Sequence, residues 1–184
     1  MSHQPEVITA AITTFRINKV WADKAVAQVD DQQLCVHLHE ETNSIAVVMK
    51  HVSGNLQSRW TEFLTTDGEK EWRNRDDEFI DTFSDRAELL AYWEKGWDCL
   101  FSSLNELTDD DIERTVTIRG EDHSVPLALQ RSLGHTCYHV GQIMMMSRIL
   151  CAGEWKVITI ARGKSSGFNK AVWGKGNFQS HQDS

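Results

Sequence analysis

Two histidines and a glutamine share one narrow side of a segment that has the pattern of a buried helix. His135, His139 and Gln142 fall within the apolar run LGHTCYHVGQIMMM. An α-helix turns by about 100° per residue, so His139 lies about 40° and Gln142 about 20° from the direction of His135. Because burial penalises polar side chains that lack partners, this stripe predicts either a hydrogen-bonded core patch or a ligand site.

Two histidines spaced four residues apart can bring their ring nitrogens to a common point, which lets one helix give two ligands to a metal. A third ligand must come from a facing helix. His51 is the best candidate, because it lies midway along the amphipathic segment VMKHVSGNLQSRW. Asn55 follows one turn later, at about 40° from it. The alternatives are a surface position for His51 beside Lys50, and a histidine patch that holds no ion.

Three neutral imidazoles leave a divalent ion with an open position, as in catalytic zinc sites, whereas structural sites are closed by four protein ligands. Such an ion lowers the pKa of bound water or holds a thiolate, and these ligands suit Zn, Ni, Fe or Co alike. No carboxylate shares either polar stripe, which argues against a protease-type general base on these two helices.

Three polar side chains near the histidines are candidates to orient the ligands or a substrate: Asn55, Tyr138 and Gln142. Tyr138 falls about 60° from His135, at the edge of the stripe. The alternative for all three is ordinary hydrogen bonding between packed helices. Cys137 lies about 200° from His135, on the other side of the helix, so we reject it as a ligand or nucleophile.

Hydrophobic periodicity predicts four helices, over about 6–29, 43–64, 85–107 and 126–153, with Thr42 or Asn43 as the N-cap of the second. The last one is apolar on most sides and is expected to be central. The β-branched run TVTI and Gly120 predict a short hairpin before it, and Pro126 suits its first position. The predicted fold is therefore an all-α four-helix bundle with a small β-hairpin before the last helix.

Composition limits the classes of partner and compartment. The chain has 184 residues and a formal net charge of −8, so an acidic surface disfavours nucleic acid as a partner. No apolar run is long enough to span a membrane, and no signal peptide is expected. Four cysteines without metal-type spacing indicate reduced thiols and a cytoplasmic location. We expect one domain over 1–160, followed by an extended C-terminal tail over 161–184 that is rich in Gly, Ser and Lys.

Two blocks of the chain carry a resemblance to a known family: NSIAVVMKHVSGNLQSRWTEFLTTDGEKEWRNRDDEF and VTIRGEDHSVPLALQRSLGHTCYHVGQI. They resemble an uncharacterised branch of the DinB-like superfamily of bacterial metal-binding four-helix bundles, and the later RGKSSGFNKAVW resembles the same branch. The resemblance extends from the first helix to about Asn169. It implies a metal triad of His51, His135 and His139, with Gln142 beside it.

The resemblance also implies classes of function. Some relatives are thiol S-transferases that join a low-molecular-weight thiol, such as bacillithiol or mycothiol, to an electrophile, and many are similar dimers. We therefore expect a homodimeric, divalent-metal-dependent enzyme, a thiol S-transferase or hydrolase, that acts on a small molecule. The alternative is a non-catalytic, metal- or ligand-binding dimer with a role in stress response.

Overall fold

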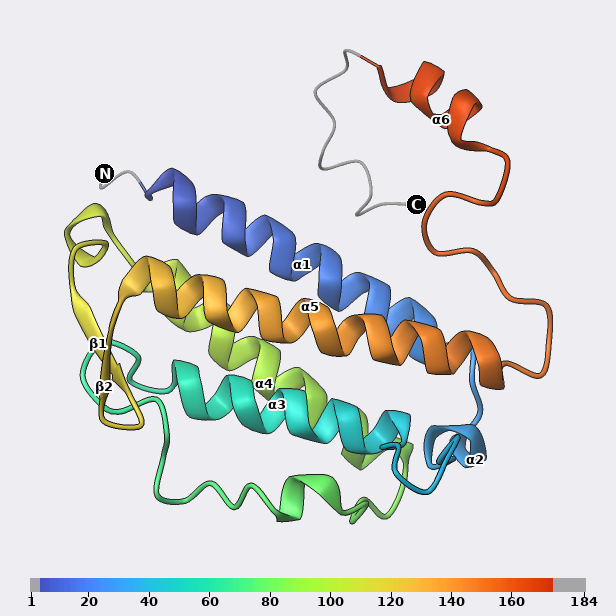
Figure 1. The fold of residues 1–184 in the computed structure, drawn as a ribbon, viewed down its shortest axis with the longest axis horizontal. Helices are drawn as coiled ribbons and strands as arrows, with labels where there is room; N and C mark the ends of the chain where they lie inside the picture. The colour runs from blue at the N-terminus through green and yellow to red at the C-terminus, as the bar shows by residue number, and fades with distance from the viewer. Residues whose placement is uncertain (1–3, 174–184) are drawn as a thin grey trace.

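Helices dominate the computed structural model, which describes residues 4–173 (Figure 1). The described residues form six α-helices, two 3-10 helices and one antiparallel hairpin. The elements are α1 (Glu6–Val26), α2 (Asp31–Leu34), α3 (Ile45–Trp60), η1 (Asp77–Phe79), α4 (Arg86–Glu106), η2 (Asp109–Asp111), β1 (Thr115–Ile118), β2 (Glu121–Ser124), α5 (Val125–Leu150) and α6 (Ser165–Val172). A mainly helical chain with a small hairpin before its last long helix is therefore confirmed.

The four long helices lie side by side, with α3 packed along α4 and α1 packed along α5 (Figure 1). The helix α3 also packs against α5, and this contact joins the two pairs. Trp93 and Trp97 of α4 meet edge to face, and Trp97 also contacts Phe15 of α1. All three side chains are fully buried, so they fill the core between the helices.

Three of the long helices begin at a side chain that accepts a backbone N–H of the first turn. These N-caps are Ser44, Asp85 and Ser124. The predicted cap of α3 at Thr42 or Asn43 is wrong, because the hydroxyl of Ser44 accepts the N–H of Val47. Pro126 is the second residue of α5, not the first. The segment between α1 and α3, expected to be a plain connection, contains α2 with a capping box.

The most enclosed helix is α3, in which every residue except Lys50 is buried. The prediction that the last helix is the central one is wrong, because α5 exposes a row of large apolar side chains. The connection after α3 explains the difference, since residues 61–85 pass along the outer side of α3 (Figure 1). Lys50 fastens this connection by donating hydrogen bonds from Nζ to the carbonyl oxygens of Asp77 and Ile80.

The hairpin turns at Arg119 and Gly120, which both have positive φ, of 58° and 73°. Positive φ at both central residues is the requirement of the tight turn that matches the twist of the two strands. The carboxylate of Asp67 accepts the backbone N–H groups of both turn residues, each at 2.8 Å. The connection that follows α3 is thus tied to the hairpin that leads into α5.

The tail expected to be an extended arm contains the short helix α6, which has no buried residue. Residues 174–184 of that tail lie outside the described residues. The proposed boundary near residue 160 stays a prediction. Within residues 4–173, no helix combines the length and the apolar character that crossing a membrane requires.

A close contact between α3 and α4 depends on Gly96. A Cβ added there would lie 2.7 Å from the Cα of Ser53, so the two backbones would have to separate. We expect Gly96→Ala to lower the free energy of unfolding by about 2 kcal/mol, measured by urea denaturation. Gly141→Ala is the matched control, since nothing lies within 4 Å of its added Cβ. The free energy of unfolding of the control should stay the same or rise by up to about 1 kcal/mol. An equal decrease in both variants would contradict this account.

Candidate metal centre

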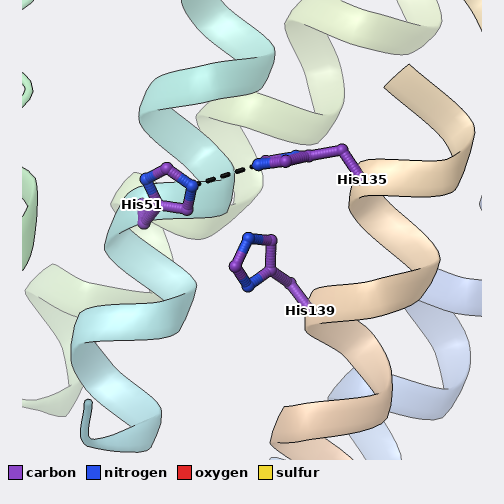
Figure 2. Close-up of side chains that lie close together, drawn as sticks. All are labelled: His51, His135 and His139. Carbon is purple, nitrogen blue, oxygen red and sulfur yellow. Dashed lines mark hydrogen bonds between the residues drawn. The ribbon is translucent and has the colours of Figure 1, made fainter. Parts of the chain in front are cut away.

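His51 of α3 and the pair His135 and His139 of α5 point into one space between the two helices (Figure 2). One candidate ligand atom from each ring lies within 4.8 Å of the others. Nε2 of His51 lies 3.1 Å from Nε2 of His135. Only 6% of His51 is exposed, so the alternative of a surface histidine beside Lys50 is wrong. The predicted convergence of the three histidines is present.

Hydrogen bonds at the far side of two rings orient their lone pairs toward the shared space. Nδ1 of His51 donates to Oε2 of Glu78 at 2.9 Å, and Nδ1 of His139 donates to Oε1 of Gln142 at 2.8 Å. A ring that donates through Nδ1 keeps the lone pair on Nε2, the arrangement seen in histidine ligands of metals. Nδ1 of His135 is buried and has no hydrogen-bond partner among the described residues.

Burial keeps two of these imidazoles neutral at ordinary pH. Desolvation lowers the pKa of His135 to about 3, and the nearby rings of His139 and His51 act in the same direction. Desolvation also lowers the pKa of His139, although its hydrogen bond with Gln142 opposes the shift. Neutral imidazoles are the form that binds a metal, so protons do not compete for these two rings near neutral pH.

The donor set fits a divalent cation. Two nitrogens bound to one tetrahedral zinc at about 2.0–2.1 Å lie about 3.3 Å apart, close to the 3.1 Å between the Nε2 atoms of His51 and His135. Three imidazoles suit zinc, nickel and iron, and the residues alone do not select among these ions. Within residues 4–173, no fourth His, Cys, Asp or Glu joins the group.

Glu78 is the site residue that the sequence did not reveal. It comes from η1, in the connection that covers α3, and only 4% of it is exposed. Arg73 donates to both of its oxygens, at 2.7 and 2.8 Å, while His51 donates to Oε2. Burial opposes ionisation, but the hydrogen bonds from Arg73 and His51 outweigh it and lower the pKa of Glu78. The carboxylate is therefore charged and locked in place.

Room for Glu78 is provided by Gly54, three residues after His51. A Cβ at that position would overlap the carboxylate of Glu78 and would lie 3.3 Å from the hydroxyl of Tyr92. Beside it, the ring of Phe79 stacks on His51 with 5.1 Å between centroids. A glycine on the histidine side of α3 was the one sequence signal for a chain segment crossing there.

The remaining predicted residues lie at different depths around the triad. Gln142 bonds His139, and Asn55 is buried beside a cavity that His51 and His135 also line. Tyr138 is 64% exposed, and its ring packs edge-on against His139 at 4.8 Å. Cys137 is exposed and does not belong to the histidine group, which agrees with its rejection as a ligand.

Comparison with known proteins shows one family and one solved relative in fold. A crystal structure of a conserved protein from Enterococcus faecalis aligns with 82% of this chain and 100% of its own, at 13% identity and a TM-score of 0.59. At that identity the likeness concerns the fold alone. A search among curated proteins found no match.

The family comparison covers almost the whole described chain. A family model described as "Protein of unknown function (DUF1572)" matches residues 3–164, which include all three histidines, Glu78 and the hairpin. The matched region stops at the start of the tail that carries α6. The chain therefore belongs to the DUF1572 family.

Proposed function

We propose that the chain is a divalent-metal-dependent enzyme of the DinB-like superfamily that acts on a small molecule. The observation that carries this proposal is the convergence of three imidazoles from α3 and α5. Within the described chain they lack a fourth protein ligand, which favours an ion with a position open for substrate. The packing of the four long helices supports the four-helix bundle of that superfamily as the fold.

The surroundings of the triad fit the two reactions expected of it, thiol S-transfer and hydrolysis. A bound divalent ion supplies a Lewis acid that stabilises a thiolate at neutral pH. Glu78 holds His51 in orientation, and because Arg73 occupies both of its oxygens, it is not free to act as a general base. An ion held by His51, His135 and His139 would favour ionisation of a substrate thiol, whose proton would pass to solvent. The thiolate would then form its S–C bond as the leaving group of the electrophile departs.

The assembly and compartment belong to the same proposal. The exposed apolar side chains on the outer side of α5 support a homodimer, since such surfaces mark contacts with partners. They are Tyr138, Met145 and Ile149. All four cysteines are unpaired, which supports the cytoplasm, where thiols stay reduced.

Metal content is the first test of the proposed function. Full-length protein purified without chelator should carry about one divalent ion per chain, measured by elemental analysis. His51→Ala and His139→Ala should each lose most of it, because either change leaves two ligands. His37→Ala is the control, since His37 is exposed and its Nδ1 lies 2.6 Å from the carbonyl oxygen of Thr42, away from the triad. Stoichiometric metal in both triad variants would refute the site.

The contact between Glu78 and His51 gives a second prediction. Glu78→Gln should weaken metal affinity by about 10- to 100-fold, measured by competition with a chelating dye, because the amide is a poorer acceptor for Nδ1 of His51. Glu71→Gln, at an exposed position of the same connection, should leave the affinity unchanged.

Glu78→Gln also removes the nearer of the two carboxylates that pair with the buried Arg73 and leaves Glu69 at 3.7 Å, so the single variant can lose stability. The double variant Arg73→Gln/Glu78→Gln removes both charges and keeps the test valid. Unchanged affinity in the folded variants would show that Glu78 does not orient the ligand.

Turnover separates the enzyme from the non-catalytic alternative. The metal-loaded protein should consume a thiol and an electrophile, such as a low-molecular-weight thiol with an alkyl halide or epoxide, faster than His51→Ala does. No turnover above that background across the panel, together with a large loss of thermal stability on chelation, would favour a metal- or ligand-binding protein of the stress response.

A further inference from the structure

A cavity of about 130 Å³ adjoins the triad and has His51 and His135 in its wall. Four arginines line it, and no Asp or Glu does; they are Arg59, Arg75, Arg119 and Arg131. They come from α3, the connection after it, the hairpin turn and α5. Four separate segments thus bring positive charge to one small space in a chain whose net charge is −8.

The acidic groups nearby do not neutralise this charge. Glu69 is shared by three of the arginines, at 3.2 Å from Arg59, 3.0 Å from Arg119 and 3.8 Å from Arg75. The carboxylate of Asp67 is also close, but it accepts backbone N–H groups of the hairpin turn and does not line the cavity. The negative charges of these two carboxylates therefore do not balance the positive charges of the three guanidinium groups.

Arg131 has no carboxylate partner among the described residues. Its Nη1 donates to Nε2 of His123 at 2.8 Å. Nδ1 of His123 in turn donates to the carbonyl of Glu121 at 2.9 Å, so Nε2 of the same ring is the acceptor for Arg131. This contact orients the guanidinium and leaves its full charge at the cavity.

The backbone conformation of Arg119 also indicates that its side chain is needed at this position. This residue has φ of 58° in a turn position where Asn, Asp and Gly are preferred, so it is held at a cost in backbone energy. Such outliers are retained where a side chain is needed at a particular place. Arg119 is one of the residues that line the cavity.

We propose that this cavity binds the oxyanion group, a carboxylate or a phosphate, of a small organic molecule. Guanidinium groups match the geometry of both, and pairs of N–H donors bind them strongly. Trp60, Phe63 and Ile118 form an apolar part of the wall, which suits the carbon portion of the same molecule. The cavity is too small for a polynucleotide, whose approach the acidic chain also disfavours.

The inference deepens the proposed function and rests on it for one point. That point is that a molecule whose oxyanion group binds in this cavity would have its reactive group close to an ion held by the histidines. Anion binding itself depends on the arginines. Isothermal titration calorimetry of the full-length protein, with and without added zinc, tests the two claims separately. The probes are inorganic phosphate and succinate, and uncharged succinamide is the control.

We expect saturable binding of phosphate, succinate or both at one site, weakening as salt rises, and no binding of succinamide. Arg131→Gln should weaken it by roughly tenfold or more, because one charge-assisted donor is lost. Arg119→Gln, at an exposed turn, is the second variant and should act likewise. Arg148→Gln, an exposed position on the same helix as Arg131, should bind as the wild type does.

Binding of one probe alone would identify the oxyanion as a carboxylate or a phosphate. Absence of saturable binding, or wild-type affinity in both Arg131→Gln and Arg119→Gln, would overturn the inference. Both variants should keep their zinc, so a failure of anion binding leaves the metal centre standing. Conversely, anion binding by a protein that takes up no zinc would refute the proposed metal-dependent function and would support the anion site.

Discussion

The relay from Arg73 through Glu78 to His51 is the interaction on which the rest of the structure depends. It places a charged carboxylate in the interior, where an unpaired ion would be strongly disfavoured, and satisfies it from both sides. It also fixes the connection after α3 across that helix and so helps to bury the outer side of α3. The same contacts therefore orient the imidazole of His51 and help to enclose α3.

Much of the helical framework could be read from the sequence, because periodicity and capping are local. The four long helices, the TVTI hairpin and the shared side of His135 and His139 all follow from spacing within one segment. The ends were less certain: Ser44, not Thr42 or Asn43, caps α3, since several adjacent polar residues can serve as a cap. The description of the matching family model assigns no functional residue.

The contacts that could not be predicted from the sequence join segments that are far apart along the chain. Glu78 lies in a segment without periodicity, 27 residues after His51, and nothing local marks it as the partner of that ring. The arginines of the cavity come from four segments, so no motif joins them. The identity of the most enclosed helix was misjudged for the same reason. Apolar character was visible along α5, but the chain that covers α3 was not.

The centre joins residues that are far apart along the chain. His51 and His135 are 84 residues apart, and the second and third imidazoles both belong to the last long helix. During synthesis, everything up to the hairpin emerges with a single imidazole of the three. All three imidazoles are together only once α5 has been made and has docked, so an ion that needs the full set would find it only at the end of folding.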